Sequence, residues 1–138
     1  MELCILVLDE TEDYVLMERS ECTSGYFYLT TKVNENDNHF DVAYNILKER
    51  AGIEKEQVDL KFMKSENITR HDGSMRNTCI LCGTLKYDSK IDNSKLKWVY
   101  LSNTYYILKE CGGDGRAYIY MVDMMQYLHN IKNKEGII

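Results

Sequence analysis

The chain has no proline among its 138 residues, so its turns must depend on glycine, asparagine and aspartate, which also favour turn conformations. It lacks long apolar segments as well, and no run approaches the roughly 20 residues that a membrane-spanning helix needs. Residues 1–8 are too short and too acidic a stretch for a secretory signal peptide. These absences predict a cytoplasmic protein without a membrane anchor.

Positive charge is in deficit, because 17 Lys and Arg residues face 22 Asp and Glu residues, which leaves a formal net charge of −5. Nonspecific binding to nucleic acid or to an anionic membrane needs a basic surface, so both functions are disfavoured. A nucleotide-like small molecule is still a compatible ligand, since a pocket needs only a few local cations.

The five cysteines do not form a recognisable metal-binding set. An odd number without an export signal indicates reduced thiols in a cytosol. "CILC", from Cys79 to Cys82, has the C-x-x-C spacing, but it lies in an apolar, strand-like run and no second pair follows. Residues three apart on a strand point to opposite faces, so the two sulfurs cannot hold one ion. The sequence therefore predicts buried structural cysteines.

Apolar patterns along the chain predict a single α/β domain. Hydrophobic residues make up 44% and charged residues 28%, which is a globular composition. The predicted strands cover 3–9, 14–20, 25–33, 58–70, 77–87 and 95–102, and the predicted helices cover about 39–51 and about 116–132. This order is typical of a mixed sheet with helices packed on it.

The segment "DNHFDVAYNILKERAGI", residues 37–53, predicts the first helix. Phe40, Ala43, Leu47 and Ala51 recur at helical spacing on one side, which gives the helix an apolar face. Gly52 stands where a glycine commonly ends a helix.

A polar stripe runs along the same helix, because Asp37, Asp41, Asn45 and Glu49 recur every four residues. Three interpretations stay open. The residues can be cap and solvent residues near the positive end of the helix dipole, the remnant of a phosphate site, or a relocated metal site in which Asp41, Asn45 and Glu49 share one ion.

The segment from Thr31 to Ile53 resembles the box motif of the Nudix family. That motif runs Gly, five residues, Glu, seven residues, and then Arg-Glu-aliphatic-x-Glu-Glu-x-Gly-aliphatic. It fits without a gap when its final pair is placed on Gly52 and Ile53. "CILVLDETEDYVLMERS" is similar to the family's opening hairpin, and "WVYLSNTYYIL", with Trp98, is similar to its late tryptophan-plus-helix segment. The resemblance covers nearly the whole chain and implies a Nudix-like α/β/α sandwich.

Most catalytic residues of the motif are absent from this sequence. Its first Glu falls on Asp37 and its Arg on Asn45. The Glu that follows this Arg falls on Ile46. Of the closing Glu pair, Glu49 is kept and the second has become Arg50. In the family, glutamates of this helix hold Mg²⁺ or Mn²⁺, so the resemblance implies a degenerate site.

One carboxylate alone binds Mg²⁺ weakly, because the ion prefers several hard oxygen ligands. Ile46 supplies no oxygen, and the fixed positive charge of Arg50 repels a dication. The same guanidinium attracts phosphate, which it can bind in bidentate fashion. The sequence thus predicts a protein that binds a nucleotide-like diphosphate ligand, with little or no hydrolysis.

Further ligand contacts are expected from Asn45, through its amide, and from Tyr28 and Trp98, which can stack on a base. Aromatic residues in a sheet are more often part of the core, and that interpretation stays open.

Two other functions are compatible with the sequence. One is a divergent Nudix hydrolase that splits the diphosphate anhydride of a nucleoside diphosphate linked to another group. Glu49 would be catalytic there, and Glu49 and Asp41 would hold Mg²⁺ or Mn²⁺. The other is a non-catalytic protein-interaction module. Many family members are homodimers, so the resemblance implies self-association as the first partnership to test.

Overall fold

The computed structural model describes residues 1–19, 26–69, 75–87, 91 and 93–104. The predicted helix at 116–132 lies outside these residues. No helix in the described part combines the length and the apolar character needed to cross a bilayer.

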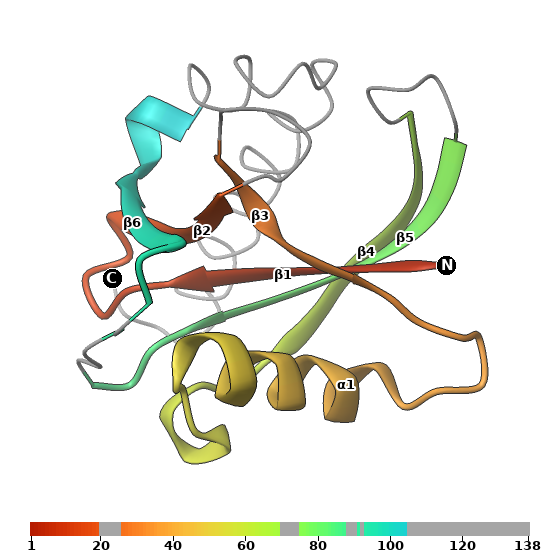
Figure 1. The fold of residues 1–138 in the computed structure, drawn as a ribbon, viewed down its shortest axis with the longest axis horizontal. Helices are drawn as coiled ribbons and strands as arrows, with labels where there is room; N and C mark the ends of the chain where they lie inside the picture. Colours follow the sequence, from red (N-terminus) through yellow and green to blue (C-terminus); the bar gives the residue numbers. More distant parts are fainter. Residues whose placement is uncertain (20–25, 70–74, 88–90, 92, 105–138) are drawn as a thin grey trace, which may run out of the picture.

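Six strands form one sheet in the order β4-β5-β1-β3-β2-β6 (Figure 1). Their bounds are β1 Glu2–Leu8, β2 Tyr14–Arg19, β3 Tyr26–Lys32, β4 Lys61–Thr69, β5 Met75–Thr84 and β6 Leu96–Tyr100. The sheet is mixed, because β1 runs parallel to β5 and antiparallel to β3. The predicted mixed sheet is confirmed.

The predicted hairpin of the first two strands is confirmed by the antiparallel pairing of β1 with β2. Its turn is organised by the Asp9 carboxylate, which accepts hydrogen bonds from the backbone N–H groups of Asp13 and Tyr14 at 3.1 and 3.0 Å. The Thr11 hydroxyl donates to the same carboxylate at 2.8 Å. An aspartate thus supplies the turn chemistry in a chain without proline.

The helix predicted at 39–51 is confirmed as α1, His39–Ile46, followed directly by a π-helical turn, η1, Leu47–Ala51. Asn38 is the N-cap, since its side chain accepts from the backbone N–H groups of Phe40 and Asp41 at 3.1 and 3.2 Å. The element ends at Gly52, whose φ of 66° is left-handed and suits glycine. Figure 1 shows α1 along one side of the sheet.

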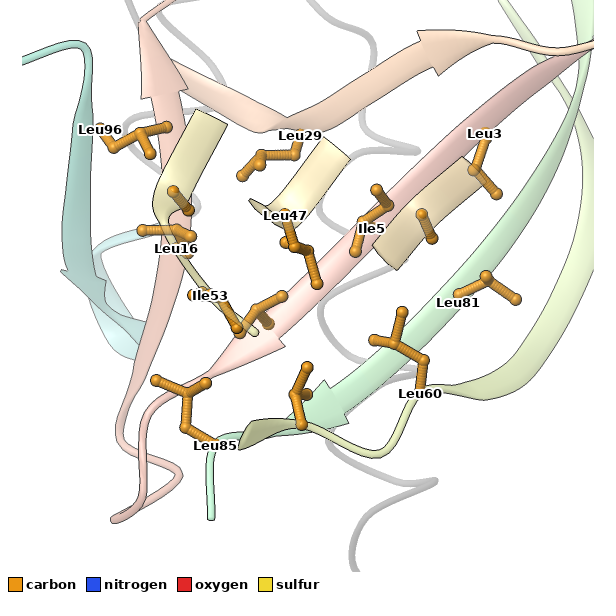
Figure 2. Close-up of a cluster of buried hydrophobic side chains, with 14 of the residues drawn as sticks. Leu3, Ile5, Leu16, Leu29, Leu47, Ile53, Leu60, Leu81, Leu85 and Leu96 are labelled. Carbon is orange, nitrogen blue, oxygen red and sulfur yellow. The ribbon is translucent and has the colours of Figure 1, made fainter. Parts of the chain in front are cut away.

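Buried side chains form two clusters. The first cluster packs β-strand residues against α1 and η1, and it comprises Leu3, Ile5, Val7, Leu16, Leu29, Val33, Ala43, Leu47, Ala51, Ile53, Val58, Leu60, Cys79, Leu81, Leu85 and Leu96. Figure 2 shows part of it, with Leu47 and Ile53 among the side chains of the sheet. The second cluster comprises Cys4, Leu6, Leu8, Val15, Met17, Tyr28, Ile80, Cys82 and Val99. Alternate residues of β1 and β2 divide between the clusters, so these lie on opposite faces of the sheet.

The two cysteines of the C-x-x-C pair lie in different clusters, Cys79 in the first and Cys82 in the second. Both are buried and free. The prediction that their sulfurs point to opposite faces as structural thiols is confirmed.

Both thiols should resist alkylation in the folded protein. Burial raises the pKa of the Cys82 thiol to about 12 and also raises the pKa of Cys79. Since the thiolate is the nucleophile, iodoacetamide at pH 8 should label them only after unfolding in urea, as mass spectrometry can show. A folded pKa above the unfolded value also means that this contribution to stability is complete below pH 9 and declines as pH rises toward 12. Rapid labelling of Cys82 in the native chain would contradict its enclosed position.

Candidate functional site

Arg50 ties the end of η1 to the sheet. Its Nη1 donates to the Glu18 carboxylate of β2 and to the backbone carbonyl of Thr30 in β3, both at 3.1 Å. The backbone carbonyl of Arg50 accepts from the Asn93 side-chain amide at 2.8 Å. Residues from four separate segments therefore meet at this point.

The alternation of β2 explains why Glu18 faces the helix. Leu16 belongs to the first cluster and Met17 to the second, so Glu18 returns to the face on which α1 packs. There it forms an ion pair with Arg50, and the Arg50 and Glu18 side chains are 32% and 26% exposed. A pair of this partial exposure contributes on the order of 1 kcal/mol to stability.

The π-helical turn changes how the last residues of the helix project. The Ile53 N–H bonds to the Leu47 carbonyl at 3.1 Å, and the Gly52 N–H bonds to the Lys48 carbonyl at 3.2 Å. The first of these bonds spans one residue more than the usual bond at a glycine-capped helix end. In this wider turn Arg50 points toward the sheet, while its neighbour Glu49 is exposed. Such turns occur frequently at functional sites.

The polar stripe of the helix faces outward. Asp41, Asn45 and Glu49 are exposed, and Asp37 accepts a hydrogen bond from the Asn34 backbone N–H at 3.0 Å in the loop before the helix. Their assignment to a ligand or metal site stays a prediction.

The divalent metal implied by the Nudix resemblance does not fit the donors that the structure describes at the end of this helix. Ile46 packs against the first cluster and offers no oxygen. Arg50 places a guanidinium on the Glu18 carboxylate, and a cation there repels a second cation. In the described part of the chain, no three His, Cys, Asp or Glu side chains converge as metal ligands.

The two aromatic residues predicted to stack on a ligand lie on opposite faces of the sheet. Tyr28 is only 2% exposed in the second cluster, and burial raises the pKa of its hydroxyl. Trp98 is partly buried against the first cluster and pairs across β6 and β2 with Leu16. Of the two, only Trp98 shares the face of the Arg50–Glu18 pair.

Three contributors to this junction were missed by sequence reasoning. Glu18 was detectable in part, because the alternation of β2 places it on the face of Leu16. Thr30 acts through its backbone carbonyl, which no side-chain pattern reveals. Asn93 lies outside any periodic segment. None of the three could be joined to Arg50 without knowing the strand order.

No protein-family model matches this sequence, and no curated protein matches it at the sequence level. Solved structures do match the fold. A C. elegans Ap4A hydrolase superimposes with a TM-score of 0.70 at 14% identity, over 92% of this chain and 96% of that chain. The E. coli dihydroneopterin triphosphate pyrophosphohydrolase superimposes with a TM-score of 0.68 at 15% identity, over 88% of this chain and 94% of that chain. The NUDIX domain of Shewanella oneidensis NrtR, complexed with ADP ribose, superimposes with a TM-score of 0.68 at 11% identity, over 92% of this chain and 86% of that chain.

The chain has the Nudix fold. Fold class and the resemblance noted in the sequence are thereby confirmed at the level of architecture. At these identities the likeness concerns the fold alone, so the chemistry of a Nudix-fold chain must come from its own side chains. Here those side chains include an arginine of η1 that is paired with a glutamate of β2.

Proposed function

We propose that this Nudix-fold protein binds a nucleotide-like ligand carrying a diphosphate, and that metal-dependent hydrolysis is weak or lost. The observation that carries the proposal is the Arg50 guanidinium, held between helix and sheet by Glu18 and Thr30. The NrtR domain of the same fold, complexed with ADP ribose, supports this class of ligand.

Arg50 can contact a phosphate and keep its anchor. Its Nη1 donates to the Thr30 backbone carbonyl as well as to the Glu18 carboxylate, so a phosphate that replaces Glu18 leaves the guanidinium held by β3. The guanidinium can then present parallel N–H donors to phosphate oxygens. Trp98 on the same face is the proposed platform for a base, and Asn45 is a proposed amide contact.

Calorimetry in EDTA tests this function directly. ADP ribose and nucleoside diphosphates should bind without metal, and adding Mg²⁺ should leave affinity and turnover nearly unchanged. Arg50→Gln should weaken binding about tenfold, the effect of one lost charge-assisted contact. Lys48→Gln is the matched control, because it removes a cation from the same turn. The Lys48 side chain is 67% exposed and pairs with Glu54 rather than with Glu18.

The alternative of a divergent hydrolase is favoured by the kept Glu49 and by the hydrolases among the structural neighbours. Binding that strictly requires Mg²⁺, or turnover that Glu49→Gln abolishes, would replace the proposed function with this one. In that case Asp41 would be the second acid that holds the metal.

We further propose a cytoplasmic protein that forms homodimers. The three described cysteines are free and buried, which suits a reducing compartment. Sedimentation at micromolar concentration should show a dimer, and a monomer throughout would rule out the self-association.

A further inference from the structure

We propose that Glu18 controls ligand binding as a tethered competitor, because its carboxylate sits on Arg50 where a phosphate would otherwise bind. This inference rests on the proposed function and names the internal group that sets its selectivity. The competing ligand chemistry is a diphosphate with more than one negative charge.

The geometry of the Arg50–Glu18 pair allows a phosphate to replace the Glu18 carboxylate. Glu18 Oε1 and the Thr30 carbonyl both accept from the same nitrogen, Nη1 of Arg50, at 3.1 Å. One acceptor is a mobile side chain and the other is backbone. If Glu18 turns away, Thr30 still holds the guanidinium in place. Arg50 can therefore change its anionic partner without losing its orientation.

The end of the helix does not depend on the ion pair for its position. Leu47 and Ala51 are 0% and 3% exposed beneath it, and the Asn93 amide holds the Arg50 backbone at 2.8 Å. Partly exposed ion pairs contribute little to stability, so breaking this one disturbs the fold only slightly. At 26% exposure, Glu18 can also turn toward water.

The competition defines which ligands can bind. A carboxylate tethered this close has an effective concentration on the order of millimolar or higher. A ligand at micromolar concentration must therefore contact Arg50 better than one carboxylate does. A diphosphate can do so through several oxygens and greater charge, whereas a monoanionic or neutral nucleoside cannot. The paired site should select for diphosphates.

Inorganic pyrophosphate, titrated by calorimetry in EDTA, tests the competition on three proteins. Glu18→Gln removes the charge but keeps an acceptor oxygen for Arg50, so pyrophosphate should bind it about tenfold more tightly than wild type. Rising salt should shrink that gain. Glu35→Gln is the control, because it removes the same charge from an exposed residue of the loop before α1 and should bind like wild type.

Circular dichroism should confirm that the variants are folded. Glu18→Asp is the second variant, since its shorter side chain withdraws from Arg50 while keeping its charge, and its affinity should lie between wild type and Glu18→Gln. Tighter binding by Glu18→Gln supports competition even if wild type binds too weakly to measure.

Equal or weaker binding by Glu18→Gln, with wild type still binding ADP ribose, overturns the competition and leaves the proposed function standing. Absence of binding by both proteins to both ligands overturns the proposed function and this inference together.

Discussion

Arg50→Glu should make the stability of this protein depend on a divalent cation. The change removes the guanidinium from Glu18 and Thr30 and places a carboxylate beside another carboxylate. Without metal the two like charges repel, and we expect a loss of about 2 kcal/mol in unfolding free energy. With millimolar Mg²⁺ or Mn²⁺, two carboxylates and a backbone carbonyl supply hard oxygen ligands, and much of that loss should return.

Thermal unfolding in EDTA and in Mg²⁺ measures this effect. Wild type should show the same melting temperature in both conditions. Arg50→Gln is the control, because it breaks the ion pair without adding a carboxylate and should not respond to metal. Arg50→Glu should also lose metal-free pyrophosphate binding, since an anion has replaced a cation. If Mg²⁺ leaves its melting temperature unchanged, the carboxylates at positions 18 and 50 do not converge.

Adding Ile46→Glu to Arg50→Glu tests the register of the box motif. The double variant restores both glutamates that the Nudix resemblance expects, so its Mg²⁺ affinity should exceed that of Arg50→Glu and some hydrolysis should return. Ile46 packs against the first cluster, so the extra charge lowers stability in EDTA. Metal affinity no better than that of the single variant would show that position 46 projects away from the site.

Leu47→Ala should cause the largest loss of stability of any single truncation proposed for this helix. Leu47 is 0% exposed and lies in the first cluster between η1 and the sheet (Figure 2). Removing its buried carbons leaves a cavity and should lower the unfolding free energy by about 3 kcal/mol. Urea denaturation followed by circular dichroism measures the change.

The neighbouring Lys48→Ala is the matched control, because its side chain is 67% exposed and forms only a surface ion pair with Glu54 at 3.8 Å. It should change stability by less than about 1 kcal/mol. Leu47→Ala should also weaken ligand binding, since Arg50 is carried by the same turn. A loss below about 1 kcal/mol for Leu47→Ala would mean that this side chain does not anchor the turn.

Local patterns of the sequence determined the elements themselves. The periodic apolar residues and Gly52 predicted a helix at 39–51, and the structure places α1 and η1 over those residues. Strand alternation alone predicted that Cys79 and Cys82 lie on opposite faces of the sheet. These predictions succeed because helix spacing, caps and strand alternation are properties of a few consecutive residues.

Only the tertiary structure decided which of these residues meet. Arg50 and Glu18 are 32 residues apart in sequence, and they meet because the strand order brings β2 and β3 under the end of the helix. The pairing register separates Tyr28 from Trp98, because Tyr28 lies opposite Met17 and Trp98 lies opposite Leu16. Residue types and spacing therefore determined the helix and the strands of the scaffold. The partner of Arg50 depended on strand order and on a widened last turn, which follow from the packing of the whole sheet rather than from any local pattern.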